Sequence, residues 1–591
     1  GPDGAGQELL VPPAISTATP LVALVHRRLA VLDPNARADQ PFSDPSARRI
    51  VFNGEIYNFR DLRAQIAGVN WRTTGDTEVL LAACAAWGDA AIAELNGMFA
   101  FAVWNPAVQS LLLARDRMGQ KPLYYAHRPG GFLAFASEAG ALLEIPWLDR
   151  AIDDNALRQY LAWGFVPEGT IYRSIRKLPP GCFLTCSGGE VRIQRYFQPN
   201  APPITVRDEP DAIARTRDLV LRAVQRQLVS DVPLGCFLSG GVDSSIVAAA
   251  MRHALGHDGQ VLTFTIGFDD PAYDESLHAA EVAAYLHTEH GRFIVHPNAA
   301  EDLPRLAAAF AEPFGDSSAL PTHYLSTVTR QRVKVALSGD GGDELFGGYD
   351  RYRAIRFSQW FSPIAPLTRA VAALLPGWHP KSPGVGARRL AASLHLPPGH
   401  RYASYLRIFD DVMLGQLFPS HGDDVVAIRF AELHAAGRNV VESALAVDRE
   451  VYLPEDLLAK VDRCSMLHAL EVRSPFMDHE LVHFAASLPA TLLLRGGGKR
   501  LLRLAFAPDL PASVFRRRKM GFAVPIGEWF RHDLRSMLHD LLLGRSGFCA
   551  SRLHRPTISR LLEEHDTRRT DHTQRLYALL MLELWSRSNK P

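Results

Sequence analysis

The sequence contains few cysteines, no long apolar run and no targeting signal. Its 591 residues include six cysteines, and no two of them form a C-x-x-C pair. Neither a disulfide framework nor a zinc cluster is therefore indicated. No stretch approaches the roughly 20 consecutive apolar residues of a transmembrane helix, and residues 1–4 lack the charged-then-apolar order of a signal peptide. These absences predict a protein of the reducing cytoplasm with no membrane partner.

An excess of charge of one sign is also missing. The 64 Lys and Arg residues oppose 63 Asp and Glu residues, and the formal net charge is +1. A protein whose main partner is nucleic acid usually carries a basic excess. Small molecules are therefore the expected partners. A homodimer is also compatible with the sequence.

Length and composition indicate more than one folded domain. The chain has 591 residues, of which 47% are hydrophobic, enough to bury large cores. The first part, up to about residue 197, contains apolar runs of strand length and one helical stretch at 78–87. This mixture predicts an α+β layered domain. The strand-like runs are 50–52, 98–104, 111–114, 123–126 and 132–136.

A proline-rich stretch divides the chain. Residues 199–210 contain four prolines among polar residues, which predicts a linker between a domain at 1–198 and a domain at 211–591. After it come a helical stretch, a short apolar strand, a glycine loop, an alanine-rich helix and another strand. This order predicts a parallel sheet of the α/β type. From about residue 349 the pattern is mostly helical. The first helical stretch is 211–229 and the first strand is 234–238. The alanine-rich helix is 244–255 and the second strand is 261–268.

The glycine loop at 239–245 has the composition of a phosphate cradle. It joins a strand to a helix, its two glycines let the backbone approach an anion, and its serines add hydroxyl donors. Asp243 would repel phosphate unless a cation bridges them, so the loop predicts Mg²⁺. The G-x-x-x-x-G-K-[ST] phosphate loop does not occur in the chain. An ordinary glycine-rich turn with a serine cap is the alternative for this segment taken alone.

A second loop favours the nucleotide interpretation. Residues 338–344 follow a strand-like segment and hold three glycines and three carboxylates. Carboxylates packed so closely repel one another, so a cation is expected among them. Two acidic loops at strand ends would form one metal-bridged nucleotide site at the carboxyl edge of the sheet.

These motifs together resemble a known family. The 239–245 loop resembles the pyrophosphatase loop of the N-type ATP pyrophosphatases. With 337–344 and 346–349 it resembles the synthetase domain of glutamine-dependent asparagine synthetases, and the resemblance covers nearly the whole chain in the right order. It implies a C-terminal parallel-sheet α/β ATP pyrophosphatase domain with a largely helical C-terminal part. Further matching segments are 312–318, 453–478 and 498–500.

The resemblance assigns binding roles to residues of the two loops. It implies that the phosphates of ATP contact Ser239, Gly240, Gly241, Ser244 and Ser245. It implies that the backbone around four further residues holds the adenosine, namely Leu238, Ile266, Ser338 and Gly339. The Mg²⁺ ligands of the family match Asp243 and Asp343.

Two further matches concern catalysis. The acidic residue that assists amide formation in the family matches Asp340, although some members carry the longer glutamate there. The lysine that contacts pyrophosphate matches Lys499. A surface lysine at a helix start is the alternative, and the glycine run before it favours function. The implied reaction is attack of the aspartate β-carboxylate on the α-phosphorus of ATP, followed by displacement of AMP by ammonia.

A second site is expected in the first domain. Residues 52–58 resemble the glutamine-site segment of class II glutamine amidotransferases, which implies a four-layer α+β fold like that of N-terminal-nucleophile hydrolases. Asn53 and Gly54 match the oxyanion hole. Arg28, Glu55 and Asp76 match the glutamine-gripping residues, because a guanidinium suits an α-carboxylate and carboxylates suit an α-ammonium. Solvated loop charges are the alternative for any one of them.

The nucleophile of that family is absent from this sequence. The family uses an N-terminal cysteine whose own α-amino group acts as the base. Residue 1 of this sequence is glycine, and the first cysteine, Cys84, is predicted to be a core residue. Either the sequence is truncated or the domain is a natural pseudo-glutaminase like that of β-lactam synthetases. Truncation is the hypothesis adopted, because the residues of the glutamine pocket remain in register.

Three functions are weighed. The first is asparagine synthesis from aspartate with glutamine-derived or free ammonia. The second keeps the machinery but amidates another carboxylate, such as a sugar acid of a surface polysaccharide, or closes an amide within a peptide or small molecule. The third is a non-catalytic regulatory protein, against which the full set of acidic and basic site residues argues. Acceptor-pocket candidates lie within 316–318 and 460–473.

Overall fold

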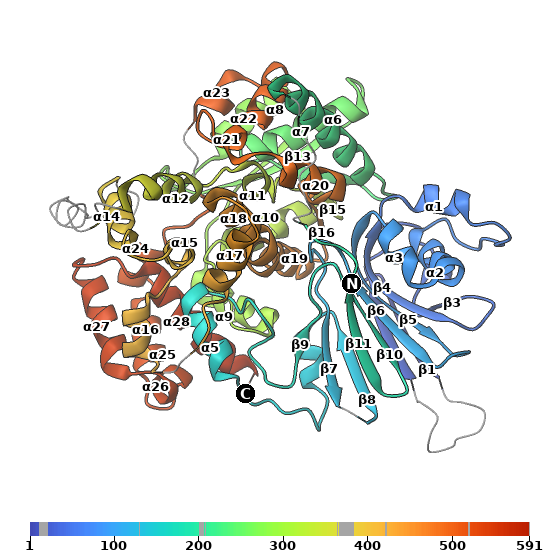
Figure 1. Ribbon diagram of the computed structural model, residues 1–591, viewed down its shortest axis with the longest axis horizontal. Coiled ribbons are helices and arrows are strands. Elements are labelled where there is room, and N and C mark those ends of the chain that lie inside the picture. Colours follow the sequence, from blue (N-terminus) through green and yellow to red (C-terminus); the bar gives the residue numbers. More distant parts are fainter. Residues whose placement is uncertain are drawn as a thin grey trace.

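A β-rich N-terminal part and a larger helix-rich C-terminal part lie side by side (Figure 1). The computed structural model describes residues 1–10, 22–128, 130–199, 206, 208–362, 365, 383–419, 422–517 and 521–589, with side chains from 388 onward in the segment that begins at 383. Most of the linker predicted at 199–210, namely 200–205 and 207, lies outside the described residues.

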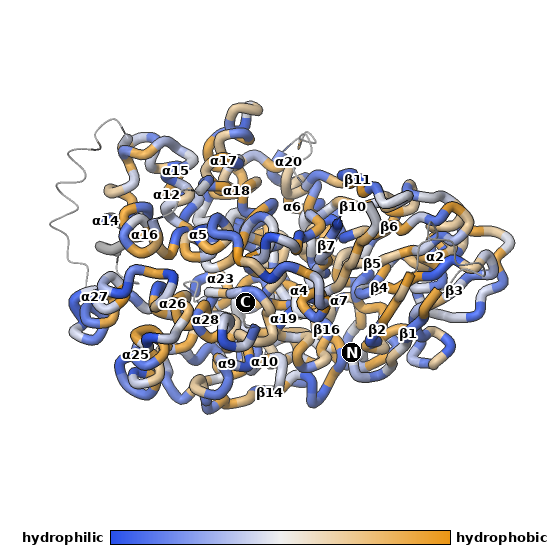
Figure 2. Tube along the Cα trace, turned by 90° about the horizontal axis from the view of Figure 1, so that it is seen from below, coloured by the Kyte–Doolittle hydropathy of each residue, from blue (hydrophilic) through white to orange (hydrophobic). Residues whose placement is uncertain are grey.

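A six-stranded antiparallel sheet forms the centre of the N-terminal part. Successive residues of its middle strands are buried because they point alternately to two cores. Phe52 and Phe101 belong to one core, and Val51 and Ala102 belong to the other. Figure 2 shows hydrophobic stretches along β4 and β5. The strand order is β11 (Glu190–Arg195), β10 (Cys182–Ser187), β6 (Ser110–Arg115), β5 (Gly97–Asn105), β4 (Arg49–Ile56) and β3 (Phe42–Ser43).

Layers cover both faces of this sheet. Helices α1 (Phe59–Gln65), α2 (Asp76–Trp87) and α3 (Ala91–Glu94) contribute Leu62, Val79 and Ile92 to the core on one face. Two smaller antiparallel sheets contribute to the core on the other face, and α4 packs outside them on β7 and β8. The expected α+β layering is confirmed. The outer elements are β1 (Gly4–Leu10), β2 (Val22–Arg28), β7 (Tyr124–Arg128), β8 (Phe132–Ala136), β9 (Arg176–Lys177) and α4 (Ala139–Leu143).

The C-terminal part is built on a five-stranded sheet in which every pairing is parallel, as the sequence predicted. Starting from the central β12, the chain adds two strands on one side and then two on the other, so the connections reverse direction next to β12. Ligands of such sheets bind outside the carboxyl ends of the strands at this reversal. The order is β14 (Glu289–Ile294), β13 (Leu262–Gly267), β12 (Leu234–Phe237), β15 (Val335–Leu337) and β16 (Glu471–Arg473).

Helices cover this sheet, since β15 and β16 are buried at every residue. Helix α6 (Glu209–Gln227) begins two residues before the prediction, because Asp208 caps it and Pro210 fits its first turn. The predicted helical C-terminal part is confirmed. The other helices are α5 (Asp154–Trp163), α7 (Val242–Leu255), α8 (Ser276–Tyr285), α9 (Ala299–Phe310), α10 (Ala319–Arg330), α11 (Gly342–Phe346), α12 (Asp350–Phe361), α14 (Pro383–Ser393), α15 (Pro398–Leu406), α16 (Asp411–Leu417), α17 (Val425–Ala435), α18 (Val440–Val447), α19 (Ala459–Met466), α20 (His479–Ser487), α21 (Ala490–Leu493), α22 (Arg500–Phe506), α23 (Ala512–Arg516), α24 (Ile526–Arg531), α25 (Arg535–Leu543), α26 (Phe548–Arg552), α27 (Arg555–Asp566) and α28 (Thr573–Asn589).

Buried polar contacts join the two parts. Lys121 Nζ lies 2.8 Å from Asp462 Oδ1, and Lys177 Nζ lies 2.9 Å from Glu455 Oε2. An apolar cluster also continues from Tyr124 of the N-terminal part into the C-terminal helices. Buried charges held across an interface fix how its two sides meet, because displacement would leave them unpaired. Within the described ranges, no helix combines the length and apolar character needed to cross a membrane.

We predict that Lys121→Met destabilises the protein by about 3–5 kcal/mol, because it leaves the Asp462 carboxylate buried without its cation. The two side chains are 3% and 11% exposed. The double variant Lys121→Met/Asp462→Leu should recover most of the loss. Urea denaturation of the three proteins measures the effect.

The matched control is Glu190→Gln, because the Glu190 and Arg192 side chains pair at 78% and 75% exposure. Its effect should stay below about 1 kcal/mol. An equally small effect of Lys121→Met would contradict a structural role for the buried pair.

Candidate functional site

The two predicted acidic loops touch at the carboxyl ends of β12 and β15. A Cβ on Gly339 would lie 2.8 Å from the Ser244 amide nitrogen. A Cβ on Gly342 would lie 2.5 Å from Asp243 Oδ1. Such contacts are too close for any side chain, so the glycines allow the loops to interlock. The structure therefore brings the two halves of the predicted nucleotide site together.

The serines of the first loop hydrogen-bond to one another. Ser239 Oγ lies 3.0 Å from Ser244 Oγ and accepts from the Gly241 amide at 3.2 Å. Gly241 begins α7 without a side-chain cap on the first turn. Ser245 Oγ is buried and has no hydrogen-bond partner among the described residues. Hydroxyls and helix amides gathered in this way suit a phosphate group.

Lys499 lies between the two predicted metal ligands. Its Nζ forms an ion pair with Asp243 and lies 2.6 Å from Asp343 Oδ1. Burial lowers the pKa of Lys499, but the two carboxylates outweigh it and hold that pKa above its usual value. The residue is 7% exposed, so it is not a surface lysine. A run of positive-φ glycines at 496–498 leads the chain into the site.

The glycines after the second loop fit around this ammonium. A Cβ on Gly348 would lie 1.9 Å from Asp343 Oδ1 and 2.3 Å from Lys499 Cε. A Cβ on Gly498 would lie 2.5 Å from the Gly347 carbonyl oxygen. Both approaches require glycine, so the ion pair depends on backbone packing as well as on charge.

Asp343 and Asp243 fit a hard cation. Both carboxylates already contact one positive group, the Lys499 ammonium. Across the described ranges, no cluster of three or more His, Cys, Asp or Glu side chains has the arrangement of a metal site. Mg²⁺ commonly takes one or two carboxylates together with phosphate oxygens. The pair therefore fits a metal that arrives with a nucleotide.

Two other acids of the second loop have raised pKa values. Burial raises the pKa of Asp340, with partial relief from Ser338 and Lys460. Burial, and then the charge of Asp343, raise the pKa of Glu344 to about 7. A carboxyl group that titrates near neutral pH can take up or release a proton during a reaction. The sequence singled out Asp340 and gave no separate role to Glu344.

The residues expected around adenosine lie at or just after the carboxyl ends of neighbouring strands. Leu238 and Ile266 are buried at the ends of the neighbouring strands β12 and β13. The Leu238 amide donates to Phe264 O at 2.8 Å, and the Ser338 amide donates to Arg473 O at 2.8 Å. The sheet thus fixes the strand ends from which the two loops emerge.

A cation–carboxylate cluster joins two of the acceptor-pocket segments. Lys460 Nζ lies 2.7 Å from Asp316 Oδ2 and donates to Ser318 Oγ at 2.8 Å. Burial raises the pKa of Asp316, but the charge of Lys460 together with the hydrogen bonds from Lys460 and Ser318 outweighs it, and the pKa lies below its usual value. Lys460 also acts electrostatically on Asp340. The cluster therefore adjoins the second loop of the predicted nucleotide site. Arg473, at the end of the second segment, lies elsewhere, beside Glu55.

One arginine at the first loop was not predictable from the sequence. Arg517 donates to the Ser239 carbonyl oxygen at 3.3 Å and pairs with Glu275. It lies at the end of α23, almost 280 residues after the loop in sequence. No local motif around it signals this contact.

A second pocket lies in the N-terminal part. It is lined by all the residues predicted to bind glutamine, and residues of the C-terminal part, including Met466 and Glu471, complete its wall. Sequence analysis did not anticipate this contribution from the other part. The predicted residues brought together are Arg28, Asn53, Gly54, Glu55 and Asp76.

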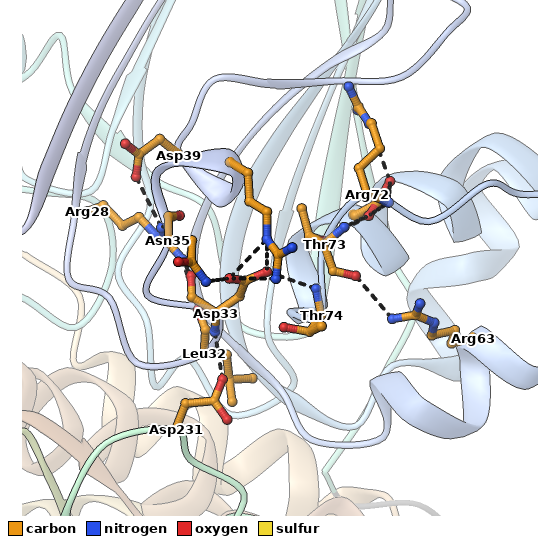
Figure 3. Close-up of polar contacts among 12 residues, drawn as sticks. Arg28, Leu32, Asp33, Asn35, Asp39, Arg63, Arg72, Thr73, Thr74 and Asp231 are labelled. Carbon is orange, nitrogen blue, oxygen red and sulfur yellow. Dashed lines mark hydrogen bonds and ion pairs between the residues drawn. The ribbon is translucent and has the colours of Figure 1, made fainter.

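Arg28 is tied to its own loop (Figure 3). Its Nη1 donates to Asn35 O at 3.0 Å and to Asp39 Oδ1 at 3.1 Å. Its Nη2 donates to Leu32 O at 2.8 Å and to Asp33 O at 2.6 Å. The Asp39 side chain is 38% exposed. An incoming carboxylate can therefore replace Asp39 more easily than the enclosed carbonyl groups.

Asp33 connects this loop to the loop that precedes Asp76 (Figure 3). Its carboxylate accepts from the Thr74 amide at 2.8 Å and from Asn35 Nδ2 at 2.8 Å. Burial raises the pKa of Asp33, but these hydrogen bonds and that from Arg37 outweigh it and hold the pKa well below its usual range. The Asp33 amide donates to Asp231 of the C-terminal part at 2.8 Å.

The two acids of the pocket are enclosed. Asp76 Oδ2 accepts from the Ile56 amide at 2.9 Å, and burial raises the pKa of Asp76 to about 6. Glu55 Oε2 lies 3.5 Å from Nη2 of the fully buried Arg473, and burial followed by the Glu471 charge raises the pKa of Glu55. Both acids can form ion pairs with an ammonium group.

The predicted oxyanion-hole residues lie on β4. Asn53 Nδ2 donates to Ser137 Oγ at 3.3 Å. Gly54 has a φ of +139°, and a Cβ there would lie 2.0 Å from the Met98 carbonyl oxygen. Cys84 lies apart, inside α2, where burial raises the pKa of its thiol to about 12. The interpretation of Cys84 as a core residue agrees with that environment.

Comparison with known proteins identifies both parts. Residues 215–587 match the family model described as asparagine synthase. Residues 14–197 match the one described as glutamine amidotransferase domain. Asparagine synthetase [glutamine-hydrolyzing] 1 of Bacillus subtilis (strain 168) is 32% identical over 95% of this chain and 89% of its own length.

Of two further relatives, one bears the name of an asparagine synthetase and the other the name of an amidase. A protein of Mycobacterium tuberculosis (strain ATCC 25618 / H37Rv) that bears the name of an asparagine synthetase is 33% identical over 97% of this chain and 90% of its own length. Amidase chry2 of Gibberella zeae is 27% identical over 88% of this chain and 84% of its own length.

We predict that Gly348→Ala weakens binding of Mg-ATP on the order of tenfold or more, about 1.4 kcal/mol. The added Cβ would press on Asp343 and Lys499. The control Gly415→Ala meets nothing within 4 Å, in helix α16. Isothermal titration calorimetry should show that Gly415→Ala binds Mg-ATP as the parent protein does, whereas Gly348→Ala binds it more weakly. Equal affinity of the two variants for Mg-ATP would refute the proposed geometry.

Asp76→Asn should raise stability more at high pH than at low pH. The pKa of about 6 means that the folded protein holds this proton when the unfolded chain has lost it. The Asp76 carboxyl group therefore lowers the free energy of unfolding by an amount that grows as pH rises from about 4 to about 6. Asparagine can still accept from Ile56. The gain in melting temperature should be larger at about pH 7.5 than at about pH 4.5.

Asp33→Asn provides the opposite control. The low pKa of Asp33 contributes stability that is present above about pH 4 and lost as pH falls further. This variant should therefore be most destabilised at neutral pH. Equal shifts for Asp76→Asn at both pH values would show that its carboxyl group is not perturbed by folding.

Proposed function

The chain belongs to the asparagine synthase family, and on this premise we propose that it converts aspartate to asparagine through a β-aspartyl-AMP intermediate. Members of this family are ATP-dependent carbon–nitrogen ligases that carry out glutamine-dependent amidation. We assign the amidotransferase part to residues 1–198 and the synthetase part to residues 211–591, with either glutamine-derived or free ammonia as the nitrogen donor.

The observation that carries the proposal is Lys499 between Asp243 and Asp343, beside the open end of α7. An ammonium at that place faces the position of the terminal phosphates of a nucleotide cradled by the serine loop. Asp243 and Asp343 would hold Mg²⁺, which stabilises negative charge on phosphate oxygens when bound. Lys499 would stabilise the charge of the departing pyrophosphate.

The first half-reaction forms an acyl-adenylate. A carboxylate oxygen of aspartate attacks the α-phosphorus of ATP, and the bond to the β-phosphate oxygen breaks. The main tasks of the protein are to hold the two reactants in line and to stabilise the charge on the leaving group. The hydroxyls of Ser239, Ser244 and Ser245 and the start of α7 would position the phosphates.

The second half-reaction forms the amide. Ammonia attacks the acyl carbon, AMP leaves, and a surplus proton must be removed from nitrogen. Asp340 or Glu344, whose pKa values are raised, can accept that proton. In the other pocket, Arg28, Glu55 and Asp76 would hold glutamine while Asn53 and Gly54 donate to the oxyanion.

A second candidate keeps the chemistry and changes the acceptor carboxylate. The similarity to Amidase chry2, which does not carry the name of an asparagine synthetase, favours this possibility. A sugar acid, a peptide or a small molecule would then be amidated. The charged cluster of Lys460 and Asp316 adjoins Asp340 and is the region where such acceptors would differ.

The test is pyrophosphate release with Mg-ATP, ammonium and one acceptor at a time. We expect release with aspartate, together with stoichiometric asparagine, and none with glucuronate. Release with glucuronate alone would replace the proposal with the second candidate. Free ammonium is used so that the outcome does not depend on glutamine hydrolysis.

Lys499→Met should lower kcat by about 10²- to 10³-fold, because the charge of the leaving group loses its ammonium partner. The KM for aspartate should change little. The control is Lys334→Met, since Lys334 pairs with Asp3 at 3.1 Å, away from the site. Similar kinetics for the two variants would exclude the assigned role of Lys499.

A further inference from the structure

Asp456 is a buried carboxyl group that no step above uses. It lies on the π-helix η4 (Asp448–Leu458), which continues into α19. The residue is 6% exposed, and its Oδ1 has no hydrogen-bond partner among the described residues. A buried carboxylate without a full set of partners is costly to the fold. π-helical segments in proteins frequently mark functional sites.

The cations that act on Asp456 are already engaged by other acids. Lys460 and Arg351 both stabilise its charge. Lys460, however, pairs with Asp316 at 2.7 Å, and Arg351 pairs with Asp448 at 2.7 Å. Asp456 therefore remains as an acid in excess. Burial, and then the nearby Asp316, raise its pKa to about 8.

Asp456 adjoins the reacting groups. Lys460 interacts electrostatically with both Asp456 and Asp340. Tyr452, one turn before Asp456, interacts with Asp456, Asp316 and Glu344. Asp456 thus belongs to the charged cluster around Lys460. This cluster is next to Asp340 and Glu344, the two acids proposed to accept the proton from nitrogen.

We propose that Asp456 is a specificity-determining residue that binds the α-ammonium of the acceptor, so that the acceptor is an α-amino acid with a side-chain carboxylate. An ammonium a few bonds from the reacting carboxylate would complete the charge balance that the fold leaves open. Lysine has three N–H donors, of which Asp316 and Ser318 take two, so Lys460 can also donate to the α-carboxylate. The inference rests on the proposed function and adds the residue that recognises the amino group of the acceptor.

The sugar acid of the second candidate lacks this feature. Its carboxylate comes without an ammonium, so it would leave the buried carboxyl group of Asp456 without the partner that an ammonium provides. A site built around a buried polar group rejects an analogue that cannot pair with it. The structure therefore favours an amino acid over a sugar acid at this pocket.

The experiment compares aspartate with succinate, which lacks only the amino group. Pyrophosphate release with free ammonium is measured for the parent protein and Asp456→Asn. We expect Asp456→Asn to lower kcat/KM for aspartate by about 10- to 100-fold, to leave kcat/KM for succinate unchanged, and to leave the KM for ATP unchanged.

Glu455→Gln is the matched control. It is the neighbouring residue on the same π-helix, but its carboxylate pairs with Lys177 of the N-terminal part at 2.9 Å. It should keep the parent preference for aspartate. Melting temperatures of the two variants report whether either has lost its fold.

The outcomes separate the inference from the proposed function. An equal loss of kcat/KM for both acceptors in Asp456→Asn, or a parent protein that prefers succinate or glucuronate, overturns the inference. If another amine-bearing carboxylate replaces aspartate as acceptor and Asp456→Asn removes the preference for its amine, the inference stands and aspartate as substrate falls. Equilibrium dialysis of aspartate and succinate measures the same preference without turnover, and equal binding by the parent protein overturns it.

Discussion

One buried ammonium group holds the synthetase site together. Lys499 lies between Asp243, on the helix after β12, and Asp343, on the helix after β15. Without a cation, these two carboxylates would repel each other at the closest approach of two glycine-rich loops. The loops can interlock only because the charges are balanced and because Gly339, Gly342 and Gly348 leave room.

The same principle governs the contact between the two parts of the chain. Arg473 is fully buried and contacts Glu55 of the proposed glutamine pocket, while its carbonyl oxygen accepts from Ser338 of the proposed nucleotide site. Lys121 and Asp462 form a second buried pair nearby. Each pair spans the two parts, and Met466 and Glu471 of the C-terminal part complete the wall of the N-terminal pocket. A shared buried network of this kind makes the two sites one structural unit.

The local motifs were predictable because each depends on a short stretch of chain. The glycines and serines of the first loop and the acids of the second are local patterns, and the parallel sheet follows from the strand, loop, helix and strand that succeed one another within 234–268. Element boundaries were less predictable. The start of α6 was placed two residues late, because capping by Asp208 and the tolerance of a first-turn proline extend the helix backwards.

The sequence by itself determined the family and the two kinds of fold and predicted the residues of both sites, because strand periodicity, glycine loops and acidic motifs are properties of neighbouring residues. Only the tertiary structure decided which charges meet. It paired Arg28 with Asp39, placed Arg517 beside Ser239 and left the Asp456 carboxyl without a full set of partners. These outcomes depend on burial and on contacts between residues far apart in sequence, and electrostatic energy inside a protein is set by that three-dimensional environment.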